Sequence, residues 1–136
     1  MDDLNKANEI AISGMKAQAE RLRVVSENLA NADSLPTAPD QIPYRRKTIT
    51  FRNVLDKTIG ADKVRVAKID VDRSQFNKIY QPNHPAADAS GYVLAPNVNS
   101  LIELMDMREA ERSYEANLDV LTTSRTMLTN TINLLK

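Results

Sequence analysis

Cysteine and tryptophan are both absent from the 136-residue sequence. Without cysteine the chain forms no disulfide and offers no thiolate metal ligand or thiol nucleophile. Four tyrosines and two phenylalanines are too few to dominate a core, so small aliphatic side chains must supply most of the packing. The three glycines are widely separated and form no phosphate-binding loop. Thiol chemistry and glycine-loop nucleotide binding are therefore excluded.

Net charge and long apolar runs are lacking as well. Lys plus Arg and Asp plus Glu each number 18, so no global field steers the chain toward nucleic acid or an anionic membrane. No apolar run approaches the roughly 18 residues of a membrane span. The acidic start MDDLNKANEI has neither the basic nor the apolar region of a secretory signal. We expect protein partners, no nucleic acid, no integral membrane segment and no cleaved signal of that type.

Proline divides the chain into three parts. All six prolines fall between positions 36 and 96. Because a proline inside a helix costs about 3 kcal/mol, the proline-free flanks permit long helices and the middle does not. We predict a helix in 1–34, a loop and small β insert in 35–96, and a helix in 97–136. The predicted fold is mainly α, with the two terminal helices paired as an antiparallel coiled coil.

Heptad spacing supports this pairing. The first flank has two columns of seven-residue spacing: Met1, Asn8, Met15, Leu22 and Leu29, and Leu4, Ala11, Gln18, Val25 and Ala32. The second flank has one column of Met107, Tyr114, Leu121, Leu128 and Leu135. A second column lies three positions earlier in each heptad, at Leu104, Glu111, Leu118, Arg125 and Ile132. Asn99 and Ser100 supply an N-cap, and Ser100 with Glu103 fits a capping box, so we predict that the second helix begins near residue 99.

More apolar residues lie outside the two columns than one partner helix can cover. They are Ile10, Ile12, Val24, Leu101, Met105, Val120, Met127 and Leu134. Exposed apolar surface of this extent indicates burial against further chains, with a bundle satisfied inside one chain as the alternative.

The middle segment alternates as short strands do. We predict strands in YRRKTITF (44–51), KVRVAKIDVD (63–72) and GYVLAP (91–96), the last ended by Pro96. In the second strand the alternation runs through Val64 and Val66 and shifts phase near Ala67 to Ile69 and Val71, which indicates a bulge.

Residues that could carry chemistry are scarce. His84 is the only histidine, and only one carboxylate lies near it in sequence. We therefore interpret it as a loop side chain hydrogen-bonded to backbone and not as a metal ligand. The pair Asp70 and Asp72 resembles a metal clamp in spacing alone. We therefore predict no enzyme, no catalytic or metal-binding residue and no cofactor. The basic run Arg45 to Lys47 fits phosphate contact, a solvated loop or a rim facing an acidic neighbour.

Three asparagines stand out on the predicted helices. Asn31 lies in the last turn of the first helix, where asparagine caps or adopts a left-handed conformation. Asn28 and Asn117 lie beside the apolar stripes. Buried amides there would fix the register between packed helices, and the alternative is that both face solvent.

Several segments resemble a known family. GMKAQAERLRVVSENLANADS is similar to the N-terminal signature of bacterial flagellar axial proteins, and PNVNSLIELMDMREAERSYEANLDVLTTSRTML to their C-terminal signature. PYRRKTITF and YQPNHPAADASGYVLAPNVNS narrow the resemblance to the proximal rod proteins of the basal body, the FlgC type. Leu35 departs from the small or polar residues often found after ADS, so the path of the 35–43 loop stays open.

The resemblance implies a structural subunit of the flagellar basal-body rod. It implies partners among other rod proteins and copies of itself, passage through the flagellar export apparatus, and helical assembly into a drive shaft and export channel. It further implies that the terminal helices form an inner coiled-coil domain. From the charge of the insert we expect it to face acidic surfaces of adjacent rod subunits. The residues we predict at subunit interfaces are Leu4, Ala11, Met15, Leu22, Val25, Asn28, Leu29, Asn31, Arg45, Arg46, Asn97, Asn99, Leu104, Met107, Tyr114, Asn117, Leu118, Leu121, Leu128 and Ile132.

One other function remains open from the sequence. A coiled-coil adaptor or chaperone that binds export substrates in the cytoplasm would show the same heptads and the same lack of chemistry. Fractionation distinguishes the two, because a rod protein co-purifies with basal bodies.

Overall fold

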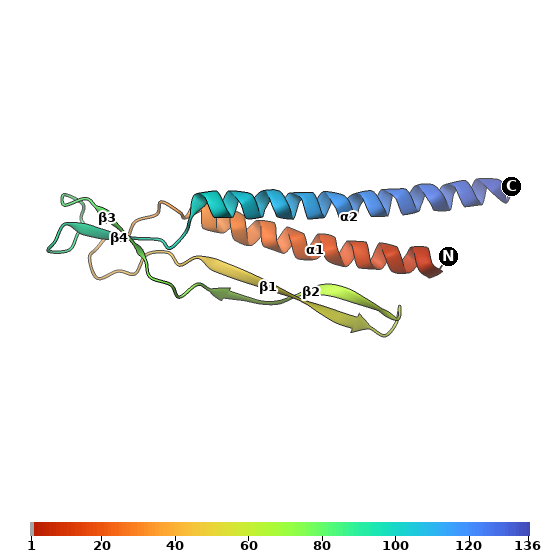
Figure 1. The fold of residues 1–136 in the computed structure, drawn as a ribbon, viewed down its shortest axis with the longest axis horizontal. Helices are drawn as coiled ribbons and strands as arrows, with labels where there is room; N and C mark the ends of the chain where they lie inside the picture. The colour runs from red at the N-terminus through yellow and green to blue at the C-terminus, as the bar shows by residue number, and fades with distance from the viewer. Residues whose placement is uncertain (1) are drawn as a thin grey trace. The chain divides into compact units, whose positions relative to one another are not determined.

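Two helices and two small sheets make up the chain, whose residues 2–136 are described by a computed structural model (Figure 1). The elements in order are α1 (Asp2–Ala30), β1 (Lys47–Asp56), β2 (Ala61–Val71), β3 (Asn77–Tyr80), β4 (Tyr92–Ala95) and α2 (Ser100–Leu134). Strand β1 pairs with β2, and β3 with β4. The predicted terminal helices and β insert are confirmed, while the seam position Met1 lies outside the described residues.

The chain divides into two compact units. Unit 1 comprises residues up to Leu22, Thr50–Lys68 and Arg108–Lys136, and unit 2 comprises Arg23–Ile49 and Ile69–Met107. Both helices and the β1–β2 hairpin contribute to each unit, because each of these elements continues from one into the other.

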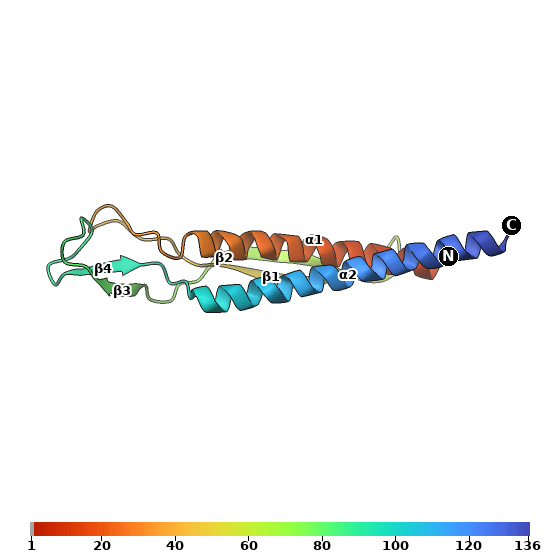
Figure 2. The same ribbon diagram turned by 90° about the horizontal axis from the view of Figure 1, so that it is seen from above.

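In unit 1 the two helices pack directly against each other. Gly14 of α1 faces the side chain of Asn117 on α2, and Arg21 forms an ion pair with Glu109 at 3.3 Å. The β1–β2 hairpin runs along α1 in both views (Figures 1 and 2). Lys63 of β2 reaches Glu9 at 3.0 Å, and the Val64 amide donates to the Ser13 hydroxyl at 3.2 Å. Helix α1 is thus contacted by both other elements of this unit.

The predicted heptad columns are buried or half-buried on α1 and only partly so on the second helix, where Leu135 is 84% exposed. All described members of both α1 columns are buried or half-buried, as are Met107, Tyr114, Leu121 and Leu128. The second α2 column is wrong, since Leu104, Glu111, Leu118, Arg125 and Ile132 are exposed. The less exposed positions lie one residue earlier, at Glu103, Ala110, Asn117 and Ser124. Small and polar residues occupy this line, so a search for large apolar residues misplaces it.

Unit 2 contains the second sheet. Strands β3 and β4 are antiparallel, with Asn77 opposite Ala95 and Tyr80 opposite Tyr92. The Tyr80 and Tyr92 rings meet edge to face, with their centroids 5.3 Å apart. Strand β4 confirms the predicted strand before Pro96, whereas β3 was not predicted because all four of its residues are exposed and show no alternation.

Gly91 closes the turn that precedes β4. Its φ of 85° lies in the left-handed region, and a Cβ there would come within 2.8 Å of the Tyr80 ring and 3.1 Å of Pro82. Only glycine can adopt this positive φ without strain and also leave the space beside Tyr80 and Pro82 free of a Cβ. The turn therefore depends on this residue for the pairing of β3 with β4.

The predicted caps at Asn99 and Asn31 are confirmed, and the predicted capping box is not. Asn99 is the N-cap of α2, because its side-chain oxygen accepts from the Leu101 amide at 3.1 Å and the Ile102 amide at 3.4 Å. The predicted capping box of Ser100 and Glu103 is wrong, since the Glu103 carboxylate is engaged elsewhere. Asn31 donates its side-chain amide to the Glu27 carbonyl at 2.9 Å, and no non-glycine residue within 2–136 has a positive φ.

The phase shift predicted in the second strand is not observed. Val64 and Val66 are half-buried, but Ile69 and Val71 are 42% and 38% exposed. The half-buried position in that stretch is Asp70, which keeps the phase of Val64 and Val66. Ile69 and Val71 therefore add to the exposed apolar surface of the chain.

Candidate subunit interface

Asn28 is the centre of a buried polar cluster in unit 2. Its side chain is fully buried, and its amide donates to the Lys47 carbonyl at 2.9 Å and to Glu103 at 3.2 Å. Its oxygen accepts from the Tyr44 hydroxyl at 2.7 Å and from the Lys47 amide at 2.9 Å. Asn28 thus ties α1 to α2 and to the start of β1. Of the two alternatives left by the sequence, the buried amide is the one observed here.

Arg46 neutralises the buried Glu103 carboxylate of this cluster. Glu103 is fully buried, and Arg46 donates its Nε to the carboxylate. The guanidinium also lies 3.8 Å from Asp72 and 3.7 Å from Asp106. Burial by itself lowers the pKa of Arg46, but the hydrogen bond and charge of Glu103, with Asp72 and Asp106, give a net rise. The pair keeps a buried negative charge compensated.

Tyr44 and Asn97 complete the cluster from the surrounding loops. Burial, together with the negative charges of Glu27 and Glu103, raises the pKa of Tyr44 to about 12, so its hydroxyl remains a donor to Asn28. The Asn97 oxygen accepts from the Arg46 amide at 2.7 Å, and its amide donates to the Asp72 carbonyl at 2.9 Å. Asn97 therefore bridges the residue before β1 and the residue after β2, at the open end of the first sheet.

The basic run finds its acidic partners inside the chain. Arg46 binds Glu103, and Lys47 binds Glu27 at 2.6 Å. The Arg45 guanidinium lies 4.2 Å from the centroid of the Phe76 ring. Contact of this run with acidic surfaces of adjacent subunits stays a prediction. The charge distribution of the sequence is consistent with pairing inside the chain. Residues 1–34 and 97–136 each hold four basic and six acidic residues, while residues 35–96 hold ten basic and six acidic ones.

Gly14 marks the closest approach of the two helices in unit 1. A Cβ at Gly14 would lie 2.8 Å from Nδ2 and 3.0 Å from Oδ1 of Asn117. The Asn117 amide is fixed by donating to the Ser113 carbonyl at 2.9 Å. Asn117 therefore packs on the backbone of α1 instead of bonding across the interface.

Replacing Gly14 with alanine tests this contact. Alanine favours a helix by about 1 kcal/mol over glycine, but overpacking costs about 1–3 kcal/mol. We expect a net loss of about 1 kcal/mol in the free energy of unfolding, measured by urea denaturation of the purified chain. In an Asn117→Ala background the same substitution should be stabilising. A stabilised single variant would contradict the close contact.

Many large apolar side chains remain exposed on α2. They are Leu101, Ile102, Leu104 and Met105 in unit 2, and Leu118, Val120, Met127, Ile132 and Leu134 in unit 1. By contrast, Ile10 is the only large apolar residue exposed on the described part of α1. A surface of this extent is typical of interaction sites. It makes α2 the principal candidate for contact with other subunits.

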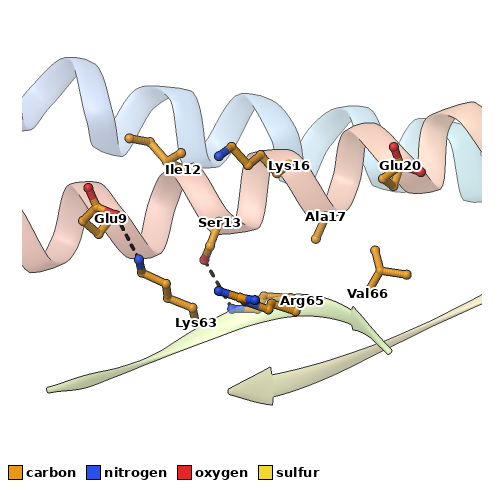
Figure 3. A pocket seen from close by; sticks show the side chains of 10 residues that line it. Glu9, Ile12, Ser13, Lys16, Ala17, Glu20, Lys63, Arg65 and Val66 are labelled. Carbon is orange, nitrogen blue, oxygen red and sulfur yellow. Dashed lines mark hydrogen bonds and ion pairs between the residues drawn. The ribbon is translucent and has the colours of Figure 1, made fainter. Parts of the chain in front are cut away.

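A groove of about 360 Å³ lies between α1 and β2 in unit 1. Figure 3 shows Ile12, Ala17 and Val66 beside it, with the Glu9–Lys63 ion pair at one end. The Ser13 hydroxyl closes part of the space by accepting from the Val64 amide. Half of the residues that line the groove are charged, namely Glu9, Lys16, Glu20, Lys63 and Arg65.

The predicted interface residues fall into three classes of exposure. Ala11, Val25 and Asn28 are buried by the chain itself, and Asn99, Leu104, Leu118 and Ile132 are exposed. The remaining members are half-buried: Leu4, Met15, Leu22, Leu29, Asn31, Arg45, Arg46, Asn97, Met107, Tyr114, Asn117, Leu121 and Leu128. The structure brings Asn28, Arg46 and Asn97 into one cluster. The role of all these residues in subunit contact stays a prediction.

Residues suited to chemistry are not assembled into a site. The His84 ring accepts the Ala86 amide at 3.0 Å, which confirms the predicted loop side chain bonded to backbone. No group of three or more metal-ligating side chains occurs among the described residues. No helix in the same part of the chain is long and apolar enough to cross a membrane.

Sequence reasoning missed several residues of the cluster and of the helix contact. In unit 2 these are Tyr44, which donates to Asn28, and the carboxylates of Asp72 and Glu103, which pair with Arg46. In unit 1, Gly14 contacts Asn117 and Ala110 is fully buried. Glu103 was assigned to a capping box from its position near the start of α2. Only the charge difference between the insert and the helices pointed to its pairing with Arg46.

Comparison with known proteins identifies the family. A model described as flagella basal body rod protein matches residues 9–34, and one described as flagellar basal body rod FlgEFG protein C-terminal matches residues 89–134. The flagellar basal-body rod protein FlgC of Agrobacterium fabrum is 53% identical over 136 residues, covering 100% of this chain and 98% of the relative. The FlgC proteins of Yersinia enterocolitica and Bacillus subtilis are 41% and 37% identical, covering 93% and 88% of this chain and 93% and 89% of their own. The chain belongs to the FlgC family of flagellar basal-body rod proteins.

Proposed function

We propose that the chain is a structural subunit of the rod in the bacterial flagellar basal body. The observation that carries this proposal is the 53% identity to a flagellar basal-body rod protein over the full length of both chains. The exposed apolar side chains of α2 support it, because a subunit of a larger assembly keeps apolar surface for its neighbours. The role of the chain is to bind other subunits, and we expect no catalysis.

We further propose that α1 and α2 form an antiparallel coiled coil in the assembled rod. In unit 1 the residue numbers of the contacts rise along α1 while they fall along α2, from Gly14 with Asn117 to Arg21 with Glu109. The seven-residue spacing of Tyr114, Leu121 and Leu128 fits a coiled-coil seam. Helix pairs of this kind would form the inner domain of the proximal rod, around the channel through which export proceeds.

Membership of the family supports a proposal for how the chain reaches the rod and assembles there. We propose that the chain is made in the cytoplasm, passes the flagellar export apparatus without a cleaved signal peptide, and assembles helically with other rod proteins and with copies of itself. Its location would then be the basal-body rod, which spans the periplasm. Helices that gain much of their apolar burial from neighbouring chains would be stabilised on assembly.

Deleting the gene in its source organism tests the proposed function. We expect cell envelopes imaged by electron microscopy to contain basal-body rings without a rod, and the cells to be non-motile. A plasmid copy of the wild-type gene should restore rods and swimming. Complete rods and filaments in the deletion strain would overturn the proposal and favour a cytoplasmic adaptor.

A further inference from the structure

Two apolar features lie on opposite flanks of the helix pair in unit 1. The first is a ridge on α2 made by Val120, Met127 and Leu134, which are 46%, 53% and 86% exposed. The second is a groove of about 210 Å³ between the helices, lined by Ile12, Met15, Lys16, Ala19, Tyr114 and Leu121. We refer to them as the ridge and the seam groove.

Helical geometry places the two features on different sides. At 3.6 residues per turn, Val120, Met127 and Leu134 lie about 60–100° to one side of Asn117, and Tyr114 and Leu121 lie about 40–60° to the other. Because Asn117 faces Gly14 of α1, it marks the direction of the partner helix. A single chain therefore cannot bring its own ridge into its own seam groove.

The ridge and the seam groove match each other in spacing. Val120 and Met127 are seven residues apart, as are Tyr114 and Leu121, which corresponds to about 10.5 Å along a helix. Met15, Tyr114 and Leu121 also belong to the seam between α1 and α2, so a third helix entering the groove would extend an existing interface. Side chains at heptad spacing can then insert as knobs into the holes of that seam.

Charges beside the two features are complementary. Asp119 directly precedes Val120 at the start of the ridge, and Arg112 lies about two helical turns before it on α2. Glu111 and Lys16 lie beside the seam groove, and Lys16 is part of its lining. All four are exposed, and none has an ion-pair partner within residues 2–136. Each feature thus has one unpaired acid and one unpaired base to offer the other.

We propose that the ridge of one copy of this chain docks into the seam groove of a second copy. The contact is heterologous, because two different surfaces meet, and each copy retains a free ridge and a free groove. Heterologous contacts continue into rings or open helices instead of stopping at a dimer. This inference rests on the proposed function and identifies the surfaces through which copies of the chain join.

Cysteine cross-linking tests this contact, and the chain contains no native cysteine to interfere. Met15→Cys places a thiol in the seam groove and Met127→Cys places one on the ridge. Both variants are produced together in cells that lack the native gene, and isolated basal bodies are oxidised and run on a non-reducing gel. We expect a cross-linked dimer when both variants are present and at most one-tenth as much with either alone.

A chain that carries both Met15→Cys and Met127→Cys provides a stricter test. A heterologous contact should produce a ladder of dimers, trimers and larger species. Thr126→Cys, one residue from Met127 and exposed on the outer side of α2, replaces Met127→Cys in the control and should remove the ladder. Leu121→Cys substitutes for Met15→Cys if that variant does not fold, and mixed purified chains give a second measurement.

The possible outcomes separate this proposal from the proposed function. Dimers formed by Met127→Cys alone would show a ridge-to-ridge contact and overturn the proposal. Swimming cells whose basal bodies contain the variants but show no cross-link would also overturn it and leave the rod assignment intact. Basal bodies with complete rods and none of the chain would contradict the rod assignment itself.

Discussion

Replacing Asn28 with aspartate is expected to lower the free energy of unfolding of the purified chain by about 3–5 kcal/mol at neutral pH, the range found when a buried charge loses its compensation. The substitution changes one NH₂ group into an oxygen and leaves the size of the side chain unchanged. That oxygen would face the Lys47 carbonyl, now 2.9 Å from the amide, and the Glu103 carboxylate, now at 3.2 Å. Two hydrogen bonds would become two repulsions inside a fully buried site.

Two further variants make this result specific. Asn31→Asp introduces the same charge three residues later, at a half-buried side chain whose amide bonds to the Glu27 carbonyl. It should cost clearly less than Asn28→Asp in the same urea titration. Combining Asn28→Asp with Glu103→Gln returns a donor to the cluster and should recover part of the loss. Equal losses for the two aspartate variants would contradict the central position of Asn28.

Removing Arg46 is expected to have an effect of similar size. Arg46→Met leaves Glu103 buried without its counter-charge, which costs about 3–5 kcal/mol when one member of a buried pair is removed. Glu103→Met leaves Arg46 with Asp72 and Asp106 and removes the acceptor of the Asn28 amide, so it should also destabilise the chain. Both are measured by urea denaturation followed by circular dichroism.

The double variant Arg46→Met with Glu103→Met completes the cycle. We expect it to lose clearly less than the sum of the two single losses, because neither charge is then left alone. Arg65→Met provides a matched control, since Arg65 is exposed on β2 and lies in the other unit. Strict additivity of the two single losses would show that Arg46 and Glu103 are not coupled.

The sequence predicts the helices because their signals are local. Proline is missing from both flanks, and heptad columns of apolar residues run through each, so the existence and approximate length of α1 and α2 follow directly. The strand before Pro96 is also local, since alternation and a terminating proline mark it. Strand β3 has no such pattern, because its stability comes from pairing with β4 and from Gly91, which is remote from it in sequence.

The contact line of α2 could not be predicted from hydrophobicity. Large apolar side chains such as Leu104 and Leu118 indicated one column of buried positions. The chain instead buries Glu103 and Ala110, which lie one residue before members of that column. Close approach of two helices favours small side chains at the crossing, as at Gly14, and leaves the large ones outside. In a subunit of an assembly, hydrophobicity marks the surface left for neighbouring chains as well as the internal core.

The contrast between Arg46 and Lys63 has a consequence for the response of the chain to ionic strength. The Glu103 carboxylate that Arg46 binds is fully buried, so dissolved ions hardly reach the space between these charges. Lys63 holds the β1–β2 hairpin against α1 through Glu9, whose side chain is 48% exposed. Added salt should therefore loosen the hairpin from α1 while the cluster around Asn28 persists. The packing of the hairpin on α1 would then vary with ionic strength, whereas the structure of the cluster around Asn28 would not.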